Sequence, residues 1–168
     1  MRNIKSFILI LAVSLVVSVA ASAQVSLVSL DGTRVDLEAQ KGKVVVLAVG
    51  AAWLPLSGKQ ADYANALVKK YAGKDVVFYY IATDSNVAKS RNFASDQDIR
   101  KFVAANKLNM PVLRDSDGAI VLKKFDIDQV PSFVILDKSG RQVGEAYGGI
   151  DPKYDITIPI SKAIDKIL

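Results

Sequence analysis

Three segments of the sequence carry residues that are candidates for catalysis or for binding an ion. Ser57 is a potential nucleophile, Asp115 and Asp117 could ligate a cation in a turn, and Gly148–Gly149 could approach a phosphate. A serine needs an adjacent base, a calcium loop needs further oxygen ligands ending in Glu, and a phosphate loop needs a longer glycine-rich motif. None of these accompanying patterns is present. We therefore expect no metal ion and no phosphate at these segments, and we interpret the two Asp side chains as solvated turn carboxylates.

Two residue types, Cys and His, are missing from the sequence altogether. Without Cys there is no disulfide, thiolate nucleophile, iron–sulfur cluster or cysteine zinc site. Without His the commonest general base and transition-metal ligand are also missing. The remaining composition, 51% hydrophobic with 22 Lys+Arg against 17 Asp+Glu, is typical of a globular domain. Because the basic residues are scattered along the chain, we expect no nucleic-acid binding.

Residues 1–23 have the pattern of a secretory signal peptide. Arg2 and Lys5 precede an apolar run, which ends in the small residues Ala21-Ser22-Ala23. A basic start, an apolar run and a small-x-small site are the three parts of a cleavable leader. We expect cleavage after Ala23, which leaves residues 24–168 as one domain in the periplasm or outside the cell.

The alternative interpretation of the leader is an uncleaved N-terminal membrane anchor. Its uncharged stretch is at the short limit for spanning a bilayer. The chain would contact a membrane only in this case. A lipoprotein is excluded, because the sequence has no Cys to acylate.

Hydrophobic periodicity and turn residues predict an α/β domain with a mixed central β-sheet, helices on both faces and an N-terminal β-hairpin. The continuous apolar runs at 43–49 and 76–83 are typical of strands covered on both faces. A capping box at Ser95 and Asp98 indicates the start of a helix. The other expected strands are 25–30, 33–37, 110–113, 132–137 and 141–147, and the other helices are 57–72, 119–125 and a C-terminal helix that buries Ile160, Ala163, Ile164 and Ile167.

Four landmarks occur in an order that resembles the thioredoxin-like superfamily, in particular its TlpA/ResA-like and redoxin (AhpC/TSA) branch. They are Leu30–Gly32, the strand-turn-helix segment Gly50–Gln60, Val130–Asp137, and the closing hairpin Asp137–Gly140 followed by Gly148–Gly149. The second resembles the family's W-C-x-x-C segment, and the third its V-P-T segment with a cis-proline. The resemblance implies a thioredoxin-like fold over about residues 25–168 and a cis bond before Pro131.

The sequence departs from this family at the residues that do its chemistry. Leu54 and Ser57 occupy the two cysteine positions, and Ala48 stands where several relatives keep a buried acid or Asn. Thiol–disulfide exchange needs a thiolate and a resolving thiol, and the peroxidase relatives need a peroxidatic Cys. We therefore predict no catalytic residue and no cofactor.

The resemblance also implies a surface, because relatives bind extended peptides between the helix start and the cis-proline loop. Such binding adds a strand through main-chain hydrogen bonds. The alternative is that Leu54 or Leu56 folds inward and leaves little apolar surface. The expected binding residues are Trp53, Leu54, Pro55, Leu56, Val130 and Pro131, with Ile150 as a further candidate.

The function favoured by these observations is non-covalent binding of a protein or peptide by a secreted or periplasmic thioredoxin-fold protein without redox activity. One alternative is the thiol-disulfide oxidoreductase or peroxide-reducing activity that the family resemblance implies. Another is a structural domain of an envelope complex.

Overall fold

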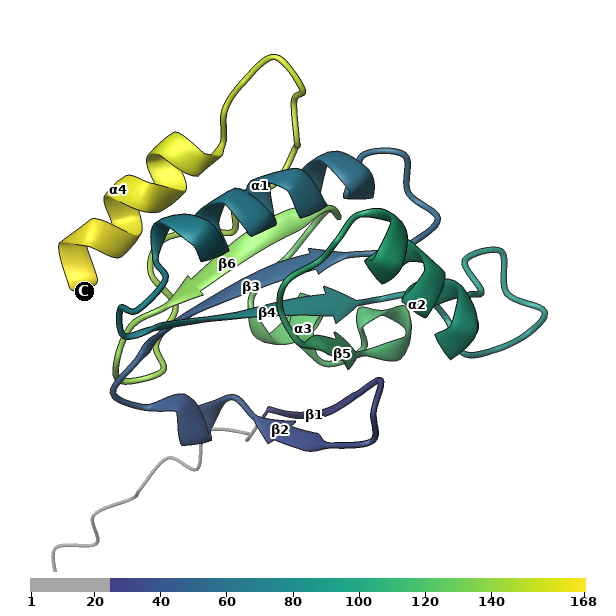
Figure 1. Ribbon diagram of the computed structural model, residues 1–168. Helices are drawn as coiled ribbons and strands as arrows, with labels where there is room; N and C mark the ends of the chain where they lie inside the picture. Colours follow the sequence, from purple (N-terminus) through teal and green to yellow (C-terminus); the bar gives the residue numbers. More distant parts are fainter. Residues whose placement is uncertain (1–24) are drawn as a thin grey trace, which may run out of the picture.

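The computed structural model describes residues 25–168 (Figure 1). The predicted signal peptide at 1–23 lies outside the described residues. The elements follow in the order β1 (Ser26–Ser29), β2 (Arg34–Asp36), the 3-10 helix η1 (Glu38–Gln40), β3 (Val44–Gly50), α1 (Ser57–Lys70), β4 (Val76–Ala82), α2 (Asp96–Ala105), β5 (Val112–Arg114), the 3-10 helix η2 (Ser116–Gly118), α3 (Val121–Lys124), β6 (Ser132–Leu136) and α4 (Thr157–Ile167).

The strands form one mixed six-stranded sheet in the order β2-β1-β5-β4-β3-β6. β3 pairs in parallel with β4 and antiparallel with β6, and β4 pairs in parallel with β5. β1 pairs antiparallel with both β2 and β5, which places the N-terminal hairpin at one edge. β3 is buried along its whole length, as its continuous apolar run predicts.

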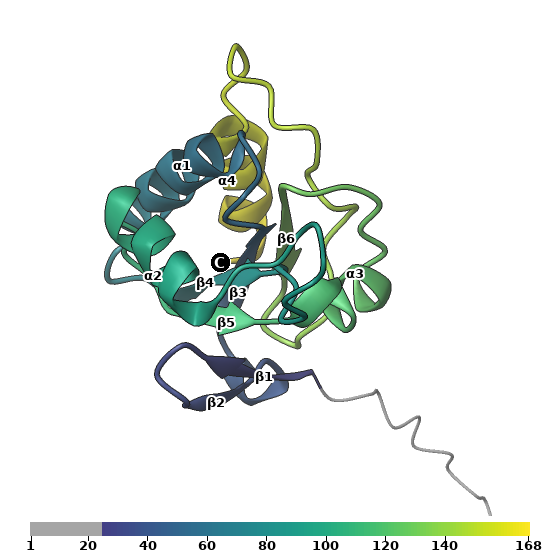
Figure 2. The ribbon, with the colours of Figure 1, turned by 90° about the vertical axis from the view of Figure 1, so that its right-hand side faces the viewer.

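Helices cover both faces of this sheet, as the sequence predicts (Figure 2). Alternate residues of β3 point to opposite faces, so Val44 and Val46 pack in one core and Val45 and Leu47 in the other. The first core also takes side chains from α1, α2 and α4, whereas the second takes them from α3 and the N-terminal hairpin. The sheet therefore separates two apolar cores.

The sequence predicts the start of α2 correctly. The capping box of α2 is confirmed, since the Ser95 hydroxyl accepts the N–H of Asp98 and the Asp98 carboxylate accepts the N–H of Ser95.

The prediction that Asp115 is a solvated turn carboxylate is wrong, because this carboxylate is buried and accepts the N–H groups of Ile120 and Val121. Its role is to hold the start of α3.

The predicted strand 141–147 is not a continuous strand. Only two isolated bridges join it to β6, between Phe133 and Tyr147 and between Leu136 and Gln142. Gly144 lies between these bridges at a positive φ of 69°, a conformation that glycine adopts without strain. The segment therefore bulges away from β6 instead of completing a ladder with it.

The turn that follows β6 is expected to loosen in acid. The Ser139 hydroxyl, with main-chain groups of Ser139 and Arg141, lowers the pKa of Asp137 from 3.8 to about 2. Because the folded state lowers this pKa, the ionised carboxylate stabilises the turn above the unfolded pKa, and the effect is lost as pH falls from 3.8 towards 2. NMR titration of the Asp137 side chain checks the midpoint, and Asp137→Asn is the control. A midpoint near 4 would contradict this assignment.

Candidate functional site

A short turn between β3 and α1 carries the residues at the two cysteine positions. The N–H of Leu54 donates to the carbonyl of Ala51 at 3.1 Å, and the N–H of Ser57 donates to the carbonyl of Leu54 at 3.1 Å. Trp53 is 54% exposed and Leu56 is 37% exposed, while Leu54 is half-buried and Ser57 is fully buried. The turn therefore presents apolar side chains to solvent and keeps its hydroxyl inside.

A buried carboxylate at the end of β4 holds this turn in place. Asp84 accepts the N–H of Ala52 at 2.9 Å and 3.1 Å from its two oxygens. Burial raises the pKa of the Asp84 carboxyl, and the hydrogen bond from Ala52 partly offsets this effect. Sequence reasoning missed this residue, although its place directly after a predicted central strand was a usable signal. Because Trp53 follows Ala52 directly, Asp84 fixes the position of the exposed tryptophan.

Beneath the turn, the side chain of Gln60 ties α1 to two strands. Its amide nitrogen Nε2 donates to the carbonyl of Val49 on β3 at 3.0 Å and to that of Ser132 on β6 at 2.7 Å. Gln60 is fully buried. Figure 1 shows β6 beginning beneath the first turn of α1. The Gln60 side chain thus brings the 53–57 turn and the residues after Pro131 together.

Polar oxygens gather around this Gln60 side chain. Among the described residues, four buried side-chain oxygens have no hydrogen-bond partner: Ser57 Oγ, Gln60 Oε1, Tyr80 OH and Ser132 Oγ. A Cβ on Gly50 would lie 2.4 Å from Gln60 Oε1, 2.6 Å from Tyr80 OH and 3.3 Å from Ser57 Oγ. Glycine is therefore required at position 50, because any side chain would collide with these groups.

This cluster does not form a nucleophilic site. Burial raises the pKa of Tyr80, so its phenol stays protonated at neutral pH and cannot act as a base for Ser57. Ser57 itself is 0% exposed and out of reach of a substrate. No group of three acidic, His or Cys side chains suitable for a metal ion occurs in the part of the chain that the structure describes.

The loop before β6 supplies the second half of the expected surface. The peptide bond between Val130 and Pro131 is cis, the geometry that the family resemblance implies. Val130 is half-buried and Pro131 is buried. Within residues 25–168, neither the N–H nor the carbonyl of Val130 makes a hydrogen bond. This main chain is free to pair with an added strand.

The structure thus assembles most of the predicted surface, with two corrections, at Ile150 and at Pro131. Ile150 is only 2% exposed and packs in the core with α1 and α4, so it cannot contribute to an exposed patch. The glycines before it turn the chain inward: Gly149 has a positive φ, and Gly148 lies against Gln129. Pro131 is buried as well, so it shapes the loop through its cis bond and presents no exposed side chain. We call the remaining set the docking patch: Trp53, Leu54, Pro55, Leu56 and Val130.

A mixed sheet in this order, with a helix starting opposite a cis-proline, defines a thioredoxin-like fold. The chain belongs to the AhpC/TSA family, whose sequence model matches residues 19–141. It is 27% identical over 119 residues to the thiol-disulfide oxidoreductase ResA of Bacillus cereus, covering 71% of this chain and 63% of that protein. It is 29% identical over 115 residues to the thioredoxin-like protein YneN of Bacillus subtilis, covering 68% of this chain and 62% of YneN. The chain therefore matches less than two thirds of the length of these relatives.

Solved structures share the fold. A secreted disulfide oxidoreductase of Mycobacterium tuberculosis superposes with a TM-score of 0.65 at 21% identity, over 85% of this chain and 96% of that one. An exposed lipoprotein thioredoxin of Streptococcus pneumoniae superposes with a TM-score of 0.67 at 23% identity, over 86% and 99%. The predicted thioredoxin-like fold is confirmed, and this member of the family has no cysteine at either active-site position.

Proposed function

We propose that this chain binds an extended segment of a protein partner at the docking patch, without covalent chemistry. The observation that carries this proposal is the combination at one place of exposed Trp53 and Leu56 with the unpaired main chain of Val130. An added strand would find main-chain partners at Val130 and apolar contacts at the two side chains.

The relative ResA is named a thiol-disulfide oxidoreductase. The residues at the matching positions of this chain do not support thiol–disulfide exchange. Leu54 cannot ionise, and Ser57 is buried beside a protonated phenol. The purified protein should therefore not accelerate insulin reduction by dithiothreitol. A rate clearly above that of dithiothreitol alone would support the redox alternative.

The docking patch makes a direct prediction for binding. Leu56→Glu should weaken binding of peptides selected from a random library displayed on phage by roughly ten- to a hundredfold. The reason is that burying one leucine side chain is worth about 1.5–3 kcal/mol. The control is Ile158→Glu, which changes another exposed apolar residue, 53% exposed, at the start of α4. Isothermal titration calorimetry measures both. Equal affinity of the two variants would place binding elsewhere.

We also propose that the chain is exported. The leader pattern at 1–23 supports this, and a structural neighbour from Mycobacterium tuberculosis is described as secreted. No helix within residues 25–168 is long and apolar enough to cross a membrane.

Processing of the leader gives a separate prediction. Because Ala21 and Ala23 provide a small-x-small site, the exported protein should begin at Gln24. Intact-mass analysis of protein from the periplasmic fraction measures this. Membrane-bound protein that retains residues 1–23 would instead establish the N-terminal anchor.

A further inference from the structure

A cavity lies beside the docking patch and shares Trp53 with it. This cavity, which we call the α2 pocket, measures about 420 Å³ and opens between the 52–53 turn, residues 93–94 and α2. Trp53 and Phe93 form exposed walls, at 54% and 39% exposure, and Phe102 contributes from α2. The ring of Phe102 packs on that of Tyr80 with centroids 5.6 Å apart, so this side of the pocket is anchored to the core.

The polar groups of the α2 pocket are already engaged within the protein. Lys101 and Asp98 form an ion pair at 3.2 Å, and the amide nitrogen of Asn106 donates to the carbonyl of Phe102 at 2.8 Å. The lining therefore offers no unpaired charge to a ligand. The rest of its lining is aromatic and aliphatic, which suits a large uncharged apolar side chain.

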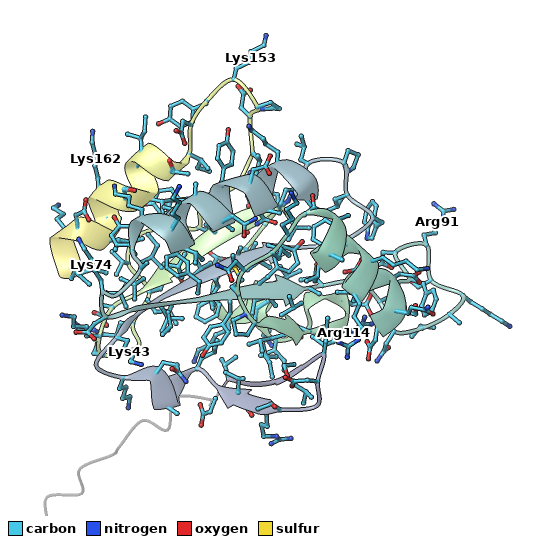
Figure 3. All side chains as sticks on the ribbon, in the orientation of Figure 1. Lys43, Lys74, Arg91, Arg114, Lys153 and Lys162 are labelled. Atoms are coloured by element: carbon cyan, nitrogen blue, oxygen red, sulfur yellow. The ribbon has the colours of Figure 1, made fainter. Side chains whose placement is uncertain are left out.

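Two cations lie in the chain segment that leads into Phe93, one wall of the α2 pocket. Lys89 and Arg91 lie in the exposed loop that ends at Phe93, and neither makes an ion pair within the described residues. The base of this loop is held in place, because Ser85 bridges to Phe93 and the Asn92 amide donates to Asp117 at 3.0 Å. Figure 3 shows Arg91 pointing away from the body of the molecule. The loop therefore carries two exposed positive charges on a base that is held against the protein.

We infer that the α2 pocket receives one large apolar side chain of the bound peptide, and that Lys89 and Arg91 select acidic residues flanking that side chain. This inference rests on the proposed function, because the peptide is the one held at the docking patch. The arguments are that the pocket continues the patch through Trp53 and that the unpaired cations complement an acidic flank.

The test uses peptides selected from a random phage library on the mature protein, with affinities measured by calorimetry. We expect the selected peptides to carry a large apolar residue next to Asp or Glu. Ala105 is exposed at the end of α2 and lines the pocket. Ala105→Phe should therefore fill the pocket and weaken binding about tenfold. Ala104→Phe is the matched control, because Ala104 is also exposed on α2 but does not line the pocket.

The charge part of the inference is tested by the double variant Lys89→Glu with Arg91→Glu. Binding should weaken about tenfold, lose its dependence on salt, and shift the selection towards basic peptides. The double variant Lys69→Glu with Lys123→Glu, which changes the net charge equally at other exposed positions, should bind like the unmodified protein.

The outcomes separate this inference from the proposed function. If peptides bind and Leu56→Glu weakens them, but Ala105→Phe and the Lys89/Arg91 variant do not, the docking patch stands and the α2 pocket is not used. If one of these two changes has no effect, the corresponding half of the inference is overturned. If no peptide is selected, the inference and the proposed function both fail.

Discussion

Replacing Leu54 and Ser57 together by cysteine should give the chain a disulfide that forms under mild oxidation and opens with dithiothreitol. The N–H of Ser57 already donates to the carbonyl of Leu54, a tight turn that brings the two Cα atoms within reach of a disulfide. The helix starts at Ser57, and Leu56 gives it no side-chain cap. The unpaired N–H groups and the positive end of the helix should lower the pKa of the thiol at position 54 below about 8.5.

Insulin reduction by this double variant should be measurable but slow, because Ala48 supplies no acid or amide beneath the site. Mass spectrometry and thiol titration measure the disulfide. The control, Leu54→Cys alone, should show one reactive thiol and no internal disulfide. A folded double variant that stays reduced in oxidised glutathione would contradict the geometry described for the turn.

Peptide affinity of the same double variant tests whether Leu54 contacts the peptide or only occupies the position of a missing cysteine. Under reducing conditions it lacks the Leu54 side chain, so a peptide held there should bind roughly ten- to a hundredfold more weakly. Ser57→Cys alone should bind normally, because Ser57 is fully buried. Restored disulfide chemistry with unchanged affinity would mean that Leu54 has no binding role.

Gly50→Ala should destabilise the protein by about 1–3 kcal/mol, the usual cost of overpacking a core. The new Cβ would lie 2.4 Å from Gln60 Oε1 and 2.6 Å from Tyr80 OH. Gln60 cannot easily give way, because its amide nitrogen is held by two main-chain carbonyls. Urea unfolding followed by circular dichroism measures the loss. A midpoint unchanged from that of the unmodified protein would contradict the close approach at Gly50.

Two further variants identify the cause of this destabilisation. Tyr80→Phe removes one of the clashing atoms, so it should recover part of the stability lost in Gly50→Ala, which a double-mutant cycle measures. Gly58→Ala makes the same chemical change on α1, where the new Cβ meets only Asn106 Oδ1 at 3.2 Å. That variant should be far less destabilised, since alanine is also the better helix former.

The sequence predicted the fold because the signals of its elements are local. The apolar runs of β3 and β4, the periodicity of α1 and the capping box of α2 each depend on residues close together in the chain. The strand expected at 141–147 failed for a related reason. Its alternation was compatible with a strand, but the bulge at Gly144 depends on how the segment meets β6.

The candidate site was predicted less completely, because its supporting residues meet only in the folded chain. The exposed residues of the 53–57 turn follow from their place at a helix start. Tyr80 lies on β4 and Asp84 just after it, and their relation to that turn depends on the parallel pairing of β3 with β4. Ile150 was assigned to the surface from the family resemblance, although the chain turns inward after Gly149.

The exposure of Trp53 has a practical consequence for spectroscopy. The sequence contains one tryptophan, and it lies on the surface at 54% exposure. Its fluorescence therefore comes from a single solvent-facing indole in the docking patch, and none comes from an indole in the hydrophobic core. Selectively excited tryptophan emission therefore reports on events at that patch, whereas it is a poor reporter of global unfolding.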